Sequence, residues 1–309
     1  MKNPVSRILL LHFMIWWMAA SASAQTNPGN ADESSIPQFR NSILINAPST
    51  AVMNPNSFEF QIRHRFGLMQ PDLQLIKDFL GTDLTANIQF RFAFPLGKKM
   101  MFGAGRAKYN KTYDVFVKRL ILQQREGGPA FALALYGAGA IRSTEFKEVA
   151  PNTFFEDGTT PFKNKFNHRL QYTGMLLVSR NFNHLLTLQF SPAFVYRNLA
   201  EAGESNYSFA IPIGGSIRTG LSSSLIFEYA YLIRYETENK LHPLSIGIEF
   251  GTTGHTFQII ASSTTALTDA ETYCSSPSDY DQGEFLLGFN LKRTFWHKKK
   301  IMRQQQLHP

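Results

Sequence analysis

Short segments that alternate apolar and polar residues make up most of this chain. In residues 86–94 the even positions hold Ala, Ile and Phe, whereas the odd positions hold Asn, Gln, Arg and Ala. A period of two is that of a β-strand with two unlike faces. The predicted strands span residues 57–66, 85–94, 99–109, 112–123, 130–142, 168–180, 184–197, 206–218, 223–235, 243–251, 255–264 and 284–295. They number about twelve, and an even number is typical of single-chain bacterial outer-membrane barrels.

The connections between these strands are alternately short and long. The short ones contain Gly, Asn or Pro, as tight turns do, and lie at residues 95–98, 125–128, 181–183, 220–222 and 252–254. Three long ones lie around residues 67–84, 143–167 and 265–283. Short periplasmic turns and long extracellular loops are characteristic of outer-membrane barrels. The pattern therefore predicts an all-β fold, a single-chain antiparallel transmembrane β-barrel with both termini in the periplasm. A secreted soluble sandwich is the alternative.

The regions around the strands predict an exported protein. Lys2 and Arg7 precede an apolar run, and Ala22-Ser23-Ala24 supplies the small residues that signal peptidase accepts. We expect residues 1–24 to be a cleaved signal peptide and the protein to reach the outer membrane of a Gram-negative bacterium. Residues 25–42 predict a flexible periplasmic lead-in, residues 43–296 the barrel and residues 297–309 a basic periplasmic tail.

Two segments have open or additional assignments. Residues 43–49 are either a short extra strand or a contact at the inner mouth of the barrel. In the first long loop, residues 71–81 have apolar residues at helical spacing and end in Gly81. This pattern predicts a short amphipathic helix over the outer mouth.

The parity of the polar residues assigns the two faces of the barrel wall. In the first strand Phe58, Phe60 and Ile62 share one face, while charged and amide side chains share the other. A charge on the lipid face costs about 2–4 kcal/mol at mid-bilayer, so the polar face must be the lumen. Arg119 is the exception, because by count it follows Tyr113 and Val115 outward. Either a bulge shifts the register there or Arg119 reaches the inner interface.

The same parity predicts a lumen with more basic than acidic groups. The predicted lumen cations include Arg63, Arg91, Arg106 and Lys118, and those at the outer mouth are Arg65, Lys108, Arg142, Arg197 and Arg234. The predicted lumen acids are Glu59, Asp114, Glu228 and Glu249. Three roles are open for the cations at the outer mouth. They could select anionic solutes in a pore, they could bind lipopolysaccharide phosphates, or they could be solvated strand ends.

These predictions leave two hypotheses for function. The first is a narrow passive pore for small anionic solutes. The second is a closed structural or adhesive barrel whose long loops bind a surface partner or lipopolysaccharide. A barrel of about twelve strands lies between those that side chains fill and those that hold a channel, so the strand number does not decide between the two.

Several local strings resemble an uncharacterised family of bacterial outer-membrane β-barrels, classed as a domain of unknown function. These strings are His64-Arg65-Phe66-Gly67, Leu80-Gly81-Thr82-Asp83, Gly103-Ala104-Gly105-Arg106, Lys111-Thr112-Tyr113-Asp114 and Gly288-Phe289-Asn290. The resemblance covers roughly residues 43–296. It implies a barrel fold that the barrel-assembly machinery inserts, and it implies no activity, cofactor or catalytic residue. Barrels of this kind commonly end on an aromatic residue, whereas here a tail follows Trp296.

The remaining chemistry points away from enzymes, cofactors and nucleic acid. The net charge of +8 is spread over strand-like segments, and the one cysteine, Cys274, cannot form an internal disulfide. The histidines and serines form no recognisable catalytic pattern, and no zinc, haem or phosphate-loop motif occurs. In the third long loop, Asp269, Glu271, Asp279, Asp281 and Glu284 only partly resemble a calcium loop. We expect that loop to be solvated, and the protein to have no metal, no cofactor and no enzymatic role. An outer-membrane hydrolase is a third, less favoured hypothesis for function.

Overall fold

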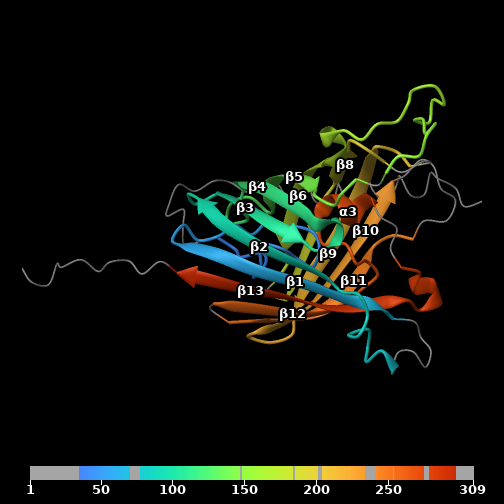
Figure 1. Ribbon diagram of the computed structural model, residues 1–309. Helices are drawn as coiled ribbons and strands as arrows, with labels where there is room; N and C mark the ends of the chain where they lie inside the picture. Colours follow the sequence, from blue (N-terminus) through green and yellow to red (C-terminus); the bar gives the residue numbers. More distant parts are fainter. Residues whose placement is uncertain are drawn as a thin grey trace, which may run out of the picture.

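The computed structural model describes residues 35–69, 77–146, 148–183, 185–200, 204–233, 241–252, 254–274 and 278–296. These residues form a closed antiparallel β-barrel, in which β13 pairs with β1 (Figure 1). The strands are β1 (Ser57–Met69), β2 (Asn87–Leu96), β3 (Met100–Ala107), β4 (Thr112–Leu122), β5 (Ala132–Arg142), β6 (Leu170–Asn181), β7 (Leu186–Phe190), β8 (Ala193–Arg197), β9 (Tyr207–Arg218), β10 (Ser223–Ile233), β11 (Leu244–Gly251), β12 (His255–Ser262) and β13 (Phe285–Trp296).

Short helices occur in the described connections. They are η1 (Tyr109–Lys111), η2 (Phe166–Arg169), α3 (Asp269–Cys274) and η3 (Tyr280–Gln282). Among the described residues, no helix has the length and apolar character that crossing a membrane requires.

Strands β7 and β8 are two halves of one position in the barrel. Pro192 lies between them, and because proline has no N–H to donate, the ladder is interrupted there. Both halves pair with β6 on one side and with β9 on the other. The barrel therefore has twelve strand positions, which confirms the predicted fold and strand number. The predicted strand ends lie within three residues of the observed ones.

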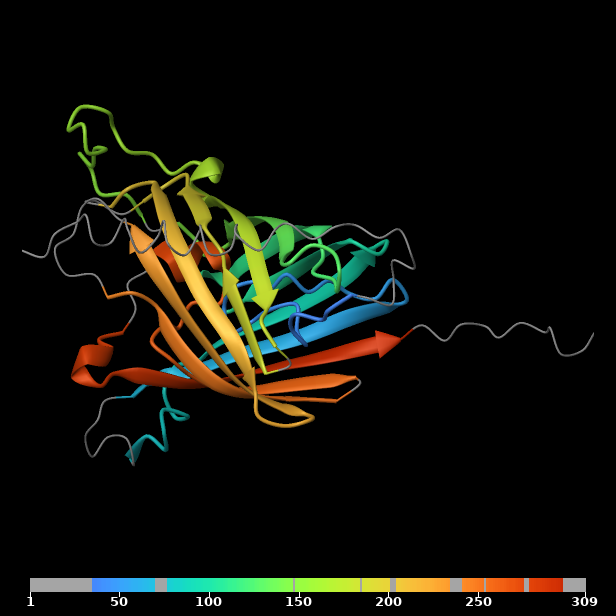
Figure 2. The same ribbon diagram turned by 180° about the vertical axis from the view of Figure 1, so that it is seen from behind.

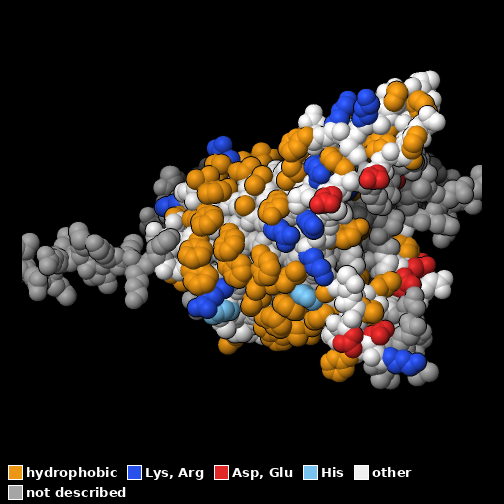
Figure 3. Space-filling model, in the orientation of Figure 1, with side chains coloured by type: hydrophobic (Ala, Val, Ile, Leu, Met, Phe, Trp, Pro, Cys, Tyr) orange, Lys and Arg blue, Asp and Glu red, His pale blue; other side chains and the backbone are white. Residues whose placement is uncertain are grey.

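The wall alternates between its two faces as the parity predicts. Along β1 every second side chain is buried, and Glu59, Arg63 and Arg65 point inward. The outward side chains are mostly apolar, and Figure 3 shows them as a hydrophobic band along the barrel wall. Phe58 and Phe295 stack across neighbouring strands in this band, with ring centroids 4.6 Å apart. This band is the surface that the sequence assigns to lipid.

Arg119 lies on this outer surface, as its parity predicts. It is exposed, and its register partners on the neighbouring strands are Met100 and Leu135. The register shift in β4 comes after it, between Leu120 and Leu122. The bulge alternative is therefore wrong, because β4 keeps its register up to Arg119.

The two ends of the barrel differ in their connections. At one end, named here the turn end, the strands are joined by short turns, and Ser57 of β1 lies opposite Trp296 of β13. The other end, named the loop end, carries the long connections. Residues 148–165 form the connection that projects from the barrel in Figures 1 and 2.

Residues 39–53, named here the plug, lie inside the barrel. Residues 41–50 are all buried, and both views show this blue segment within the ring of strands (Figures 1 and 2). The segment turns back on itself, because Leu44 N–H donates to the carbonyl of Ala47 and Ser49 N–H donates to that of Ser42. Leu44 and Ile45 pack against wall residues such as Ile226.

The plug corrects two predictions. The flexible lead-in over residues 25–42 is wrong at its end, because Ile36 N–H donates to the carbonyl of Gln124 at 3.0 Å and residues 41–42 are buried. Residues 43–49 are neither an extra strand nor a contact at the mouth but the buried centre of the plug. Residues 1–34 and 297–309, which include the predicted signal peptide and tail, lie outside the described residues.

The third long connection enters the lumen from the loop end. All six residues of α3 are buried, and Ala270, Tyr273 and Cys274 join the apolar cluster of the interior. The prediction of a solvated loop is therefore wrong for Asp269 and Glu271, which lie on this helix. In the first long connection, residues 71–76 of the predicted helix lie outside the described residues, and Gly81 has the left-handed φ of 77°.

Gly103 tests the packing between the wall and its contents. It points into the lumen, where an added Cβ would collide with the ring of Phe116 and the carbonyl oxygen of Phe92. We expect Gly103→Ala to lower the free energy of unfolding by about 1–3 kcal/mol, the usual cost of overpacking, in a urea titration of the refolded barrel. Gly139→Ala is the matched control, because nothing lies within 4 Å of its added Cβ. Equal losses in the two variants would contradict this packing.

Candidate functional site

Glu228 holds the plug from the centre of β10. Its carboxylate accepts hydrogen bonds from three consecutive backbone N–H groups, those of Ile45, Asn46 and Ala47, at 3.0–3.2 Å. The carboxylate is buried, so these donors replace the water that an ionised group requires. The tight turn of the plug aligns its amides, and the strand parity aims Glu228 at them.

Basic side chains of the wall hold the carbonyl groups of the same segment. Lys118 on β4 donates to the carbonyls of Ser42 and Ser49, at 3.0 and 2.8 Å. Lys292 on β13 donates to the carbonyl of Arg40 at 2.8 Å and lies 3.6 Å from Glu59. The plug therefore offers both its N–H and its C=O groups to charged residues of the wall.

Two arginines of β1 contact both the plug and the wall. Arg65 donates to the side-chain oxygens of Asn290 and Asn46, at 3.0 and 2.9 Å. Arg63 donates to Gln89 and to the carbonyl of Leu267, at 3.0 and 2.7 Å. Both guanidinium groups are fully buried. The oxygens that accept these hydrogen bonds are neutral, so they do not cancel the charge of the two guanidinium groups.

A second cluster joins α3 to the wall. Arg91 forms an ion pair with Asp114 at 2.7 Å and lies 3.8 Å from Asp269 of α3. Tyr136 donates to Asp269 at 2.5 Å, and the Arg91 guanidinium lies 4.3 Å from the centroid of the Phe116 ring. This cluster fixes α3 through charged side chains on both partners.

The other acid of α3 is held by hydroxyl and amide groups. Glu271 accepts from Thr112, Asn110 and Thr268 at 2.9–3.2 Å. Burial raises the pKa of Glu271, and these hydrogen bonds act in the opposite direction. Burial also raises the pKa of Asp269, against the effect of Arg91. The helix thus fills the lumen with both carboxylates engaged.

All four predicted lumen acids lie inside the barrel. Glu59, Asp114, Glu228 and Glu249 are buried. Asp114 forms an ion pair with Arg91. Glu59 accepts from Ser42 and Gln61, and Glu249 accepts from Gln258.

Arg106 corrects the predicted set of lumen cations. It lies on the outer face of β3, with its guanidinium 5.5 Å from the centroid of the Tyr113 ring. It has the same parity as Phe102, which is exposed on the outer face. The neighbours Gly103 and Gly105 carry no side chain that would mark the inner face. Near the loop end a long basic side chain reaches polar surroundings from an outward position.

The predicted ring of cations at the outer mouth is partly dispersed. Arg65 is deep in the lumen, and Lys108 is exposed beyond the end of β3, where it donates to the carbonyl of Ala86. The Arg142 guanidinium faces the side-chain amide of Gln171. Arg197 forms an ion pair with Glu204 at 2.9 Å. Arg234 lies outside the described residues.

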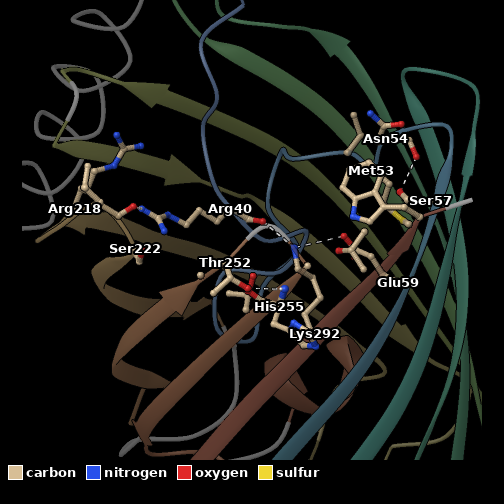
Figure 4. Close-up of a pocket in the computed structure, with 17 residues that line it drawn as sticks. Arg40, Met53, Asn54, Ser57, Glu59, Arg218, Ser222, Thr252, His255 and Lys292 are labelled. Carbon is tan, nitrogen blue, oxygen red and sulfur yellow. Dashed lines mark hydrogen bonds and ion pairs between the residues drawn. The ribbon is translucent and has the colours of Figure 1, made fainter. Parts of the chain in front are cut away.

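A cavity of about 620 Å³ lies at the turn end, between the plug and the strands β1 and β9–β13 (Figure 4). Its basic side chains are Arg40, Arg218 and Lys292, and its carboxylate is Glu59. In Figure 4 Arg218 and the guanidinium of Arg40 lie on one side of the cavity, and Lys292 and Glu59 lie on the other. Strand and turn residues supply hydroxyl groups to its lining.

Sequence reasoning missed the plug, α3 and this cavity. One signal for α3 was available, because Thr268-Asp-Ala-Glu271 has the Thr-x-x-Glu spacing typical of a helix start. One signal for the plug was Glu228, an acid at the middle of a strand. The cavity had no such signal, since its lining comes from the plug, two turns and several distant strands.

One family profile matches most of the chain. The family is described as "Membrane bound beta barrel domain (DUF5777)", and the match covers residues 39–295. The chain belongs to this family. It is a membrane-bound β-barrel, and the predicted resemblance to an uncharacterised barrel family is confirmed. The match begins at the first residue of the plug, so the family domain includes the plug as well as the wall.

Solved structures of outer-membrane proteins are similar at low identity. The KdgM porin is 6% identical with a TM-score of 0.44, and the match covers 77% of this chain and 99% of that one. The NanC porin is 5% identical with a TM-score of 0.47 over the same shares. Outer membrane phospholipase A from Escherichia coli is 11% identical with a TM-score of 0.38, over 89% and 96%. Similarity at this level indicates no function. No curated protein matches the sequence.

Removing the Glu228 carboxylate should loosen the plug. Because Glu228 accepts from three plug amides, and hydrogen bonds to charged groups contribute about 1.5–3 kcal/mol each, we expect Glu228→Ala to increase hydrogen exchange at Ile45, Asn46 and Ala47 at least tenfold. Hydrogen exchange with mass spectrometry on the refolded barrel measures this change. Glu249→Ala is the matched control, because Glu249 is a buried wall acid that accepts from Gln258 of the wall rather than from a plug amide. Unchanged exchange in Glu228→Ala would contradict the assigned contact.

Proposed function

We propose that this protein is a porin-like outer-membrane barrel that is closed at rest and admits small anionic solutes when the plug leaves its lumen. The sequence led us to expect an open passive pore, whereas the proposed pore is closed by the plug until the plug leaves. The proposal rests on what holds the plug, on the charges that the plug covers, and on the export and barrel features of the sequence.

The observation that carries this proposal is the pairing of lumen cations with neutral oxygens of the plug. Lys118 donates hydrogen bonds to two plug carbonyls, and Arg65 and Lys292 each donate one hydrogen bond to the plug. Arg63 also lies near the carbonyls of Ile45 and Asn46, at 3.4 and 3.5 Å. Without the plug these four cations would face water. Fixed positive charge along a pore favours anions.

The acids that the plug covers do not balance these cations. Glu228 would lose its three amide donors, and Glu59 would lose the hydroxyl of Ser42 but keep Lys292 nearby. Asp114 is already paired with Arg91. With Glu249 included, the wall strands have six buried cations and four buried carboxylates, and α3 adds the carboxylates of Asp269 and Glu271. The anion preference is therefore supported by the position of the cations that lose their plug oxygens, not by the total charge of the lumen.

Deleting residues 35–53 tests the proposal. We expect the native chain to show little or no conductance in planar bilayers, because the lumen is filled. The deletion variant should show steady conductance with a preference for chloride over potassium, read from the reversal potential in a salt gradient.

A point variant supplies a milder opening. Glu228→Ala should give intermittent conductance, whereas Glu249→Ala should behave as the native chain. Equal conductance of the native chain and the deletion variant, or a preference for cations in the latter, would overturn the proposed function.

A second function is favoured by the projecting connection at the loop end. Residues 148–165 have their own contacts, since Phe155 and Phe162 lie 5.0 Å apart in an edge-to-face pair and Phe154 forms a bridge with Pro161. Hydrogen bonds from Thr160 and Thr159 lower the pKa of Asp157 in the turn between them. Phe154 is nevertheless exposed. An ordered loop with an exposed aromatic residue suits binding to a surface partner or to lipopolysaccharide.

Deletion of residues 146–164 separates the two functions. If the barrel conducts, this deletion combined with removal of residues 35–53 should leave the conductance within about twofold, because the loop lies outside the lumen. If the loop is adhesive, the native chain should bind immobilised lipopolysaccharide and the loop deletion should lose that binding. A loss of conductance together with retained lipopolysaccharide binding would contradict both assignments.

We also infer that the barrel is not an enzyme. Two described histidines contact aromatic rings on the outside, His64 beside Phe289 at 5.1 Å and His168 beside Phe162 at 5.7 Å between ring centroids. These contacts support a packing role for both. Lipase or protease activity that His64→Ala or His168→Ala abolishes would refute this inference.

A further inference from the structure

We propose that the turn-end cavity is a binding site for a small organic anion that carries a carboxylate or phosphate group. This inference rests on the proposed function, because it names where the anionic solute binds on the turn-end side. It places that site at the opposite end of the barrel from the cation ring expected at the outer mouth.

The charge of the lining is the first support. Arg40, Arg218 and Lys292 line the cavity together with one carboxylate, that of Glu59. Glu59 already accepts from Ser42 and Gln61 and lies 3.6 Å from Lys292. Within the described part of the chain, neither Arg40 nor Arg218 is paired with a carboxylate. The cavity therefore has uncompensated positive charge, as an anion site requires.

The placement of Arg40 is the second support. Its backbone carbonyl accepts from Lys292 at 2.8 Å, and its guanidinium donates to the carbonyl of Leu221 at 2.7 Å. In Figure 4 the side chain extends from the plug toward the turn at Ser222. A guanidinium has five N–H donors, so donors remain for a carboxylate or phosphate, which arginine binds with two parallel hydrogen bonds. Because both ends of Arg40 are held, little ordering is needed on binding.

The size and polarity of the cavity indicate a compact polar ligand. A volume of about 620 Å³ lies in the range of small-molecule sites. Ser222, Thr252 and Thr256 contribute hydroxyl groups to the lining, which suits a ligand with hydroxyl or further carboxyl groups. Leu221, Thr252 and Gly254 of the short turns border the cavity, so a solute would enter from the turn end.

Two arginines outside this cavity are already paired with carboxylates. Arg197 is paired with Glu204, and Arg91 is paired with Asp114. Arg40 and Arg218 are therefore more available to an anion than these two arginines.

The chain from Gln25 onward has a single tryptophan, whose fluorescence gives a direct assay. Of the three tryptophans, Trp16 and Trp17 lie before Gln25, and Trp296 lines the cavity. We expect titration of the refolded chain from Gln25 onward with citrate, or with inorganic phosphate, to change its fluorescence saturably. Glucose, which is neutral, should give no saturable change. The two anions distinguish a carboxylate site from a phosphate site.

Matched arginine variants locate the site. Arg218→Gln removes an exposed cavity cation and should weaken anion binding about tenfold, as should Arg40→Gln, whereas Arg40→Lys should recover part of the affinity. Arg119→Gln is the control, because Arg119 is a basic residue on the outer face near the turn end, and it should bind as the native chain does. Unchanged folding of Arg218→Gln is checked by its heat-resistant migration in gels.

The outcomes separate this inference from the proposed function. No saturable signal with either anion, or equal affinity in the native chain and Arg218→Gln, would overturn the cavity as an anion site. If the chain lacking residues 35–53 still conducts anions selectively, the proposed function stands while this inference fails. If binding is observed and that variant conducts no anions, the cavity is a binding site in a barrel that is not a pore.

Discussion

Every charged group inside this barrel must find its partners inside the lumen, because the outer face of the wall is apolar. Glu228 shows how strict this requirement is. It lies at mid-strand on β10, it is buried, and its carboxylate is satisfied by three amides of the plug. A buried carboxylate without such donors would cost several kcal/mol. The closed wall and the plug are therefore parts of one polar arrangement rather than a container and a separate filling.

The two segments that fill the lumen are held in different ways. α3 is tied by charged side chains on both partners, through Asp269, Tyr136 and Arg91. The plug is tied through neutral groups, which are its backbone amides and carbonyls and side chains such as those of Ser42 and Asn46. When a neutral carbonyl leaves a lysine, water or an anion takes its place, whereas separating a buried ion pair exposes two opposite charges. This difference makes the plug the more readily exchanged of the two, which is why the proposed opening involves the plug and leaves α3 in position.

The wall could be predicted from the sequence because its rule is local. Parity assigned Glu59, Arg63 and Lys118 to the lumen and Arg119 to the outside, and the structure has them on these faces. The rule failed at Arg106, where Gly103 and Gly105 left the faces of β3 unmarked. It does not apply to the plug, whose backbone contacts join distant residues, such as the Ser42 carbonyl and Lys118, 76 positions apart. A segment that pairs through its backbone leaves little trace in its side chains, so its place in the lumen could not be read from its composition.

Arg40 connects closure of the barrel with its turn-end cavity. Its carbonyl oxygen is a partner of Lys292, and its guanidinium lines the cavity and reaches the carbonyl of Leu221. Lys292 in turn lies near Glu59, whose other partner is Ser42 of the plug. An anion that draws hydrogen bonds from Arg40 or Lys292 therefore competes with bonds that anchor the plug. By linkage, any ligand that binds one state of the plug better than the other shifts the balance between them. The residues that would recognise a solute are thus among those that hold the lumen closed.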